Sequence, residues 1–432
     1  RGRGADGVVQ RGDVLDVLLA AVGPVDGLDV PAVGLVARGD VLGEGDVGVA
    51  LDGDPVAVVD DGEVAELLVA GDRGHLAADA LLEVTVGGDD VDVVVEERLA
   101  LRGLGIEQAA LAAGLGWDVP ASSVNKVCLS GLTAIIDAAR MIRVGDADVV
   151  VAGGMESMTR APHLLMGSRE GWQYGSVEVL DHMDLDGLTD AYDNESMGAS
   201  TERHNDRFEV TREQQDAVAA LSHQRAAAAT AAGVFADEIV PIEVPQRRGD
   251  PLVVTTDEGI RPDTTVETLG RLRAAFAEGG SITAGNSSQI SDGAAAVVLT
   301  HRAHADRRGW PVLAVIGANG QVAGPDNSLH AQPARAIARA LEKEGLEASD
   351  LDFVEINEAF GAVVARSQAE LGVDSDVVNI HGGGIAVGHP IGASGARLVV
   401  HAVYELGRRG SGTAAVALCG GGGQGEALIL TR

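Results

Sequence analysis

From residue 106 onwards, hydrophobic and polar positions follow the periods of helices and strands. Residues 106–115 place Ala and Leu on one face and predict a short helix. Residues 121–127 predict a strand and residues 149–154 a second, buried strand, with a helical pattern between them that stops at Gly145. This β-α-β order predicts a parallel sheet with a right-handed crossover.

A second unit with the same layout lies near the C-terminus. Residues 384–395 open a helix that runs to about Leu406, and residues 413–418 predict an apolar strand. Each unit places a candidate reactive side chain at the turn before its helix and ends its last strand on glycines. We therefore expect an α/β fold built from two similar halves that face one another.

Between the two units, residues 155–282 form a long stretch rich in Gly, Asp, Arg and Met. Its one convincing helix covers residues 211–232, because Thr211 and Gln214 have the spacing of a capping box and Gly233 ends the pattern. We expect the rest to be an inserted loop domain that covers the site. The expected domains are residues 106–300, which contain this insertion, and residues 301–432.

Residues 1–105 differ in composition from the rest of the chain. The first 100 residues contain 22 Asp and Glu against 6 Arg and no Lys, a net charge of −16, and no Phe, Trp, Tyr, Ile, Met, Ser, Asn or Cys. Neither a helical nor a strand period persists there. Because the segment lacks most of the large side chains that fill a core, we expect that it does not fit the fold.

Two origins agree with this composition. Every residue through Gly105 except Thr85 can be encoded by a codon that begins with G or C, as expected if the opposite strand of a GC-rich gene is read in register. An antisense or misjoined translation is therefore our first hypothesis. The alternative is an acidic, low-complexity extension that is disordered or loosely structured.

The overall composition narrows the function classes. A net charge of −33 leaves no global basic field for a polyanion, which disfavours nucleic-acid binding. No run approaches 18 apolar residues, so we expect no membrane span. Two Cys in 432 residues are too few for a disulfide framework and favour a reducing, cytoplasmic location, where each thiol is a candidate for reactivity.

Taken one at a time, the candidate catalytic residues are ambiguous. Cys128 lies at a strand-to-helix turn, where the helix dipole favours a thiolate, but Cys128 and Cys419 alone are more typical of buried structural thiols. His389 lies among glycines that would let a ligand approach. Asn357 follows an apolar strand, where it acts either as a site residue or as a helix cap. No metal-ligand spacing connects these residues, so we expect no metal.

Four motifs are more specific together than any one alone. They are VNKVCLSG (residues 124–131), NEAF (357–360), GHPIGASG (388–395) and CGGGGQG (419–425), in that order. With the further segments GGMESM, RPDT and TAGNSSQISDGA, the chain resembles the thiolase family from about residue 108 to the C-terminus, most closely the acetyl-CoA acetyltransferases. The resemblance implies a thiolase-like fold and acyl transfer between coenzyme A (CoA) thioesters.

The resemblance also implies roles for the motif residues. Cys128 would be the nucleophile that forms an acyl-enzyme, His389 the base that takes its proton, and Cys419 the acid or base for the α-carbon of the second acetyl group. Asn357, through a held water, and His389 would serve one oxyanion site, and the backbone N–H groups of Cys128 and Gly421 the other. The implied partners are acetyl-CoA, CoA and 3-ketoacyl-CoA, without a permanently bound cofactor, in a homodimer or homotetramer.

Binding the phosphates of CoA requires local basic residues in so acidic a chain. By resemblance, Arg247 would bind the nucleotide end, and Ala284 and Ser288 would bind the pantetheine arm. The channel would be lined by Leu188, Met197, Phe276 and Phe360. Phe276 can also be read as an ordinary core residue.

Several alternatives stay open. Short-chain thiolases usually carry His before the Met of the loop motif, where this chain has Ser196, so a longer-chain 3-ketoacyl-CoA thiolase of fatty-acid β-oxidation is the second candidate. The Arg-Thr-Pro-x-Gly motif of the family is absent from residues 1–105, so the first sheet would lack strands and the chain could be an inactive or unfolded acyl-CoA-binding product. A ketoacyl synthase would require His where this chain has Cys419.

Overall fold

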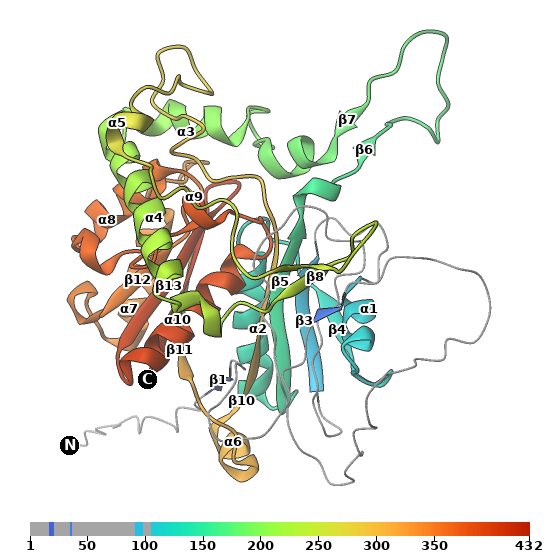
Figure 1. The fold of residues 1–432 in the computed structure, drawn as a ribbon, viewed down its shortest axis with the longest axis vertical. Coiled ribbons are helices and arrows are strands. Elements are labelled where there is room, and N and C mark those ends of the chain that lie inside the picture. The colour runs from blue at the N-terminus through green and yellow to red at the C-terminus, as the bar shows by residue number, and fades with distance from the viewer. Residues whose placement is uncertain (1–16, 21–34, 37–90, 98–104) are drawn as a thin grey trace, which may run out of the picture.

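A mixed sheet of nine strands forms the centre of the computed structural model, which describes residues 17–20, 35–36, 91–97 and 105–432 (Figure 1). Its strands are β1 (Val17–Ala20), β3 (Val91–Glu97), β4 (Ala121–Ser123), β5 (Val149–Ser157), β10 (Asp292–His301), β11 (Ala314–Ala323), β12 (Phe353–Ile356), β13 (Thr413–Gly420) and β14 (Gln424–Thr431). They lie in the order β12-β13-β14-β11-β1-β10-β5-β3-β4.

Helices cover this sheet and also lie between its two halves (Figure 1). They are α1 (Gly105–Ala112), α2 (Ser130–Val144), α3 (Met197–Asn205), α4 (Arg212–Ala231), α5 (Val266–Leu269), α6 (Arg302–Arg308), α7 (Gln332–Glu344), α8 (Gly361–Leu371), α9 (Gly384–Val387) and α10 (Ser394–Arg409). No helix within the described ranges is long and apolar enough to cross a membrane.

The sheet consists of two halves with the same internal order. In the first half, β3 pairs parallel with β5, β5 antiparallel with β10, and β10 antiparallel with β1. In the second half, β12 pairs parallel with β13, β13 antiparallel with β14, and β14 antiparallel with β11. Strands β1 and β11 join the halves. The predicted duplication is confirmed, with α2 and α10 in equivalent positions.

Helices α2 and α10 meet near the centre of the molecule, at Gly131 and Gly395 (Figure 1). A Cβ at Gly131 would lie 2.7 Å from the carbonyl oxygen of Gly392, and a Cβ at Gly395 would collide with the backbone nitrogen of Leu132. Glycine at both positions therefore lets the two helix backbones touch. The Cys128 turn comes directly before α2, and the His389 turn comes directly before α10. The contact between these two helices therefore brings the two turns close together.

Strands β1 and β3 come from residues 1–105, the segment with the unusual composition, and both lie in the nine-stranded sheet. Strand β3 pairs with β4 and β5, and β1 pairs with β10 and β11. We expected the first half to lack strands from this segment, but the runs VLLA and VDVVVEE are rich in the β-branched and aliphatic residues that favour strands. The two hypotheses about the origin of residues 1–105 concern the whole segment, most of which lies outside the residues that the structure describes.

The insertion between β5 and β10 contains α3, α4 and α5 and all strands but β2 of two small sheets. The predicted capping box is confirmed, because Thr211 Oγ accepts from the Gln214 N–H and the Gln214 side chain accepts from the Thr211 N–H. A hairpin projects far from the body as an arm (Figure 1). The small-sheet strands are β2 (Leu35–Val36), β6 (His163–Leu164), β7 (Leu180–Asp181), β8 (Ile242–Val244) and β9 (Leu252–Val254), of which β6 and β7 form the arm.

Candidate active site

Cys128 lies in a strained turn between β4 and α2. The strand predicted over residues 121–127 ends at Ser123, because the Asn125 side chain accepts from the Val127 N–H (3.1 Å) and starts a turn. Val127 has a φ of +56°, which a β-branched residue rarely adopts. Ser130 Oγ holds the turn, since it donates to the Val127 carbonyl oxygen (2.6 Å) and accepts from the Lys126 N–H (2.7 Å).

His389 is buried between two polar side chains. Ser394 Oγ donates to the Pro390 carbonyl oxygen (2.9 Å) and lies 2.5 Å from His389 Nδ1, so it accepts a hydrogen bond from Nδ1–H and leaves the lone pair on Nε2. Asn357 Nδ2 lies 3.2 Å from His389 Nε2. Burial, with a contribution from the Arg397 charge, lowers the pKa of His389 to about 4. The imidazole is therefore a neutral base at neutral pH.

Cys419 is the second-last residue of β13 and lies in an apolar cluster that includes Ile282 and Phe360. Burial, and after it the nearby Cys128 thiol, raises the pKa of Cys419 and keeps it protonated. Neither cysteine forms a disulfide. The glycine turn after Cys419 packs beside the Cys128 turn. A Cβ placed on Gly421 would lie only 3.6 Å from Val127 Cγ1.

Glu358 ties the NEAF segment to the loop that leads to His389. Its buried carboxylate accepts from Ser222 Oγ (2.5 Å), from Asn379 Nδ2 (2.8 Å) and from the Ile385 N–H (3.0 Å). The neighbouring Asn357 Oδ1 is buried and has no hydrogen-bond partner among the residues that the structure describes. We did not identify Glu358 or Ser394 as site residues from the sequence, although both belong to motifs that we identified. The partners of Glu358 come from distant segments of the sequence, and Ser394 lies at the start of a helix, where a serine is common.

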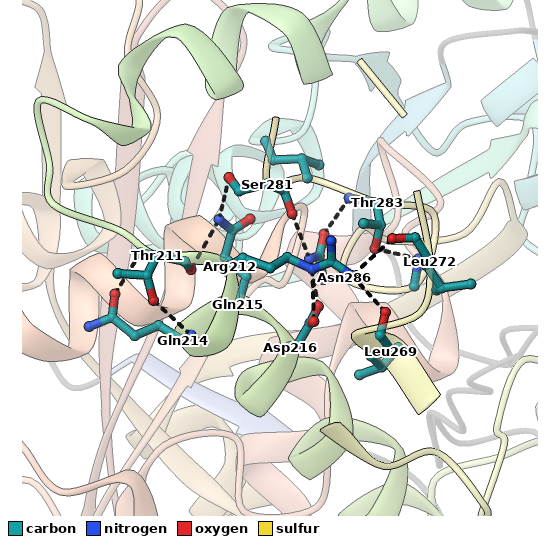
Figure 2. A network of polar contacts seen from close by, with 12 residues as sticks. Thr211, Arg212, Gln214, Gln215, Asp216, Leu269, Leu272, Ser281, Thr283 and Asn286 are labelled. Carbon is teal, nitrogen blue, oxygen red and sulfur yellow. Dashed lines mark hydrogen bonds and ion pairs between the residues drawn. The ribbon is translucent and has the colours of Figure 1, made fainter. Parts of the chain in front are cut away.

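The network in Figure 2 fixes the loop that carries Ala284 and Ser288. Asn286 Nδ2 donates to Asp216 Oδ1 (2.9 Å), and Arg212 Nε donates to Asp216 Oδ2 (2.7 Å). The Ser288 N–H donates to the Ala359 carbonyl oxygen (3.0 Å). The loop is thus anchored to α4 on one side and to the NEAF segment on the other.

Three of the four predicted channel residues gather beside Cys419. Met197 and Phe360 pack in the same cluster as Cys419, and Phe276 meets Phe360 edge to face with ring centroids 6.2 Å apart. Phe276 is 37% exposed, so it lies at the edge of the cluster and not in a closed core. A Cβ at Gly198 would collide with the Phe276 ring. The fourth residue, Leu188, is half-buried at the end of a π-helical turn (Met183–Leu188).

Arg247 stands apart from these residues. It is exposed on the loop between β8 and β9, and the described part of the chain provides no hydrogen bond or ion pair that ties it to the motif turns. Ser196 caps α3 by accepting from the Ala199 N–H (3.2 Å). Within residues the structure describes, no group of three or more His, Cys, Asp or Glu could hold a metal ion.

Acid is expected to destabilise the fold as the pH falls from 6.5 towards 4. Burial lowers the pKa of His389, His223 and His381 to about 4, while each titrates near 6.5 when unfolded. The unfolded chain then binds more protons, so stability present above pH 6.5 is lost on acidification. For His401, burial is outweighed by two nearby carboxylates, which raise the pKa, and burial raises the pKa of Glu355 to about 7; both groups act in the opposite direction to the three histidines. Calorimetry should show a lower Tm at pH 5 than at pH 7; an unchanged or higher Tm would contradict this.

Comparison with known proteins agrees with this geometry. The family description "Thiolase, N-terminal domain" matches residues 71–303, and "Thiolase, C-terminal domain" matches residues 310–432. The first match starts before the boundary at residue 105 that composition suggested. A protein of Mycolicibacterium smegmatis named "Probable acetyl-CoA acetyltransferase" is 54% identical over 365 residues, which cover 84% of this chain and 94% of the relative.

Other relatives carry related names. An acetyl-CoA acetyltransferase of Chromobacterium violaceum is 46% identical over 84% of this chain and 94% of its own length. Human mitochondrial 3-ketoacyl-CoA thiolase superposes with a TM-score of 0.75 at 36% identity, over 80% of this chain and 87% of that one. Since the family matches span most of the sequence and these relatives are covered almost completely, the chain belongs to the thiolase family.

Proposed function

We propose that the chain transfers acyl groups between CoA thioesters, condensing two acetyl-CoA to acetoacetyl-CoA or cleaving the product with CoA. The observation that carries the proposal is the meeting of the Cys128 turn, the glycine turn after Cys419 and the buried His389–Asn357 pair at the crossing of α2 and α10. The names of the relatives support acetyl-CoA as the substrate class.

In the first half-reaction, neutral His389 takes the proton of the Cys128 thiol, and the thiolate attacks the acetyl-CoA carbonyl carbon. CoA leaves with a proton from His389, and Cys128 carries the acetyl group. A thiol suits this exchange because the attacking and leaving sulfur atoms have comparable basicity. The backbone N–H groups of Cys128 and Gly421 would stabilise the oxyanion that forms.

In the second half-reaction, Cys419 would first give its thiol proton to neutral His389 and then, as a thiolate, take a proton from the α-carbon of a second acetyl-CoA. The resulting enolate would attack the acetyl group on Cys128. The C–C bond forms as the Cys128 thiolate leaves and recovers a proton from His389, and acetoacetyl-CoA is released. Asn357 and His389 would stabilise the enolate oxygen. The unpartnered Asn357 Oδ1 supports a water held at that point. In thiolysis, the protonated Cys419 would return its proton to the carbon.

A longer 3-ketoacyl-CoA is the second candidate substrate. Ser196 occupies the position where short-chain thiolases usually have His, and it caps α3. Thiolysis rates for acetoacetyl-CoA and for longer 3-ketoacyl-CoA esters, measured with CoA and the full chain, decide between the candidates. A kcat/KM that falls with chain length supports the short-chain proposal, and one that rises contradicts it.

Ser394→Ala is expected to slow acetylation of Cys128 about tenfold. The variant removes the acceptor that orients His389 through Nδ1–H, and one net hydrogen bond is worth about 1 kcal/mol. Stopped-flow measurement of the CoA burst tests this, with Ser394→Thr as the matched variant that keeps the hydroxyl group. Equal burst rates in the wild type and Ser394→Ala would exclude an orienting role for Ser394.

Arg247→Ala is expected to raise KM for CoA about twofold to fivefold and to leave kcat unchanged, because an exposed charge contributes about 1 kcal/mol or less to binding a phosphate. The effect should shrink at high salt. Arg248→Ala, which removes the neighbouring exposed arginine, is the matched control. A fall in kcat at constant KM would remove Arg247 from the nucleotide site.

The proposal includes a homo-oligomer in a reducing compartment such as the cytoplasm. The arm formed by β6 and β7 exposes several large apolar side chains, which favours burial against another copy. They are Leu165, Met166, Trp172, Tyr174, Val177 and Val179. Light scattering of the purified chain measures the oligomeric state, and both proposed catalytic thiols require reducing conditions.

A further inference from the structure

Glu426 is a fully buried carboxylate that receives hydrogen bonds from three different elements. Lys126 Nζ donates to Oε1 (3.2 Å), Thr133 Oγ1 donates to Oε2 (2.5 Å), and Gln321 Nε2 also donates to Oε1. Glu426 is 0% exposed and the Lys126 side chain is 24% exposed. Both carboxylate oxygens accept hydrogen bonds, and the ammonium group of Lys126 is the ion-pair partner of this buried carboxylate.

The position of this pair connects the two candidate cysteines. Lys126 lies two residues before Cys128, and Thr133 lies on the first turn of α2 that follows it. Glu426 pairs with Leu418 in the ladder between β13 and β14, next to the pair formed by Cys419 and Gly425. One carboxylate therefore joins the turn that carries Cys128 to the strand pair that carries Cys419.

The turn needs such support. Val127 lies between Lys126 and Cys128 with its strained φ of +56°, and strain of this kind persists only where the surroundings over-determine the backbone. Ser130 holds the backbone of the turn from within α2. The Lys126 side chain reaches from this turn to the opposite half of the molecule, where it meets Glu426.

We infer that Lys126 and Glu426 are positioning residues that act as a charged pair, holding the Cys128 turn against the Cys419 strand so that Cys128 is presented as a reactive thiol. This inference rests on the proposed function, in which Cys128 is the nucleophile, and it names two residues that would position Cys128 for that reaction. The reactivity of Cys128 towards a neutral alkylating reagent reports on it without any thioester chemistry.

The experiment compares Lys126→Met, Lys126→Arg and Glu426→Gln with the wild type. The chain has two lysines, so Lys343→Met, on the exposed face of α7, is the same substitution as a matched control. Each protein is treated with iodoacetamide at fixed pH, and the alkylation rate at Cys128 is followed by peptide mass spectrometry. The acetyl-CoA burst is measured in parallel, and Tm is recorded for each variant.

Lys126→Met and Glu426→Gln are expected to slow alkylation of Cys128 about tenfold or more, while Lys126→Arg and Lys343→Met stay within about threefold of the wild type. Rescue by Arg distinguishes a charged pair from simple packing. Alkylation of Lys126→Met at the wild-type rate, or equal losses in Lys126→Met and Lys126→Arg, would overturn the inference. If Lys126→Met does not fold, the contrast between Lys126→Arg and Glu426→Gln decides in the same way. A wild type that is alkylated but never acetylated would instead refute the proposed function.

Discussion

Cys128→Ser is expected to reduce both condensation and thiolysis about 10³-fold or more, because the acyl-enzyme can no longer form at a useful rate. A serine hydroxyl is a far weaker nucleophile than a thiol, and His389, with its pKa lowered to about 4, is too weak a base to ionise it. The CoA burst with acetyl-CoA should disappear. Rates are measured from acetoacetyl-CoA consumption and from the burst amplitude.

The fold should tolerate this change. Cys128 is half-buried, and the turn around it is held by Ser130 and Lys126 and not by the thiol alone. A Tm close to that of the wild type would therefore show that the loss is chemical. If Cys128→Ser retains thiolysis within about tenfold of the wild type, another residue is the nucleophile.

Cys419→Ser is expected to retain the acetyl-CoA burst but to lose condensation about 10²-fold to 10⁴-fold, the usual contribution of a positioned acid or base. Cys419 is buried at the end of β13, and its pKa is raised by burial and then by Cys128, so it rests as a thiol that can exchange a proton with carbon. Serine keeps the size of the side chain but exchanges such a proton poorly.

The separation of the two steps is the decisive part of this prediction. Acetylation of Cys128 and exchange of the acetyl α-protons with deuterated water are measured on the same variant. Retained acetylation with lost exchange assigns the proton transfer to Cys419. Equal loss of both would mean that Cys419 supports the site as a whole and has no separate chemical role.

Much of the fold follows from local patterns. Buried strands, the helices that contain Gly131 and Gly395, and the capping box of α4 are encoded within short stretches, so the sequence predicted them and the duplication they form. The strand expected over residues 121–127 was too long, because the Asn125 side chain competes with the ladder for backbone groups. Strands β1 and β3 were missed, since composition masked their aliphatic runs.

The candidate site was only partly predictable for a physical reason. The motifs contain the residues that we propose to face the substrate, whereas the residues that support them come from distant parts of the sequence. Lys126 and Glu426 are separated by 300 residues, and Ser222 and Glu358 by 136. Such pairs carry no local signal in a single sequence and appear only when the two halves pack together.

The most direct test of the account is the covalent state of Cys128 after exposure to acetyl-CoA. The folded wild-type chain is mixed with acetyl-CoA, quenched in acid, and examined by intact-mass and peptide mass spectrometry, with Cys128→Ser as the control. The account predicts one acetyl group per chain, on Cys128, with release of an equal amount of CoA, and none in the control. An unmodified folded chain, or an acetyl group that persists in Cys128→Ser, would contradict it.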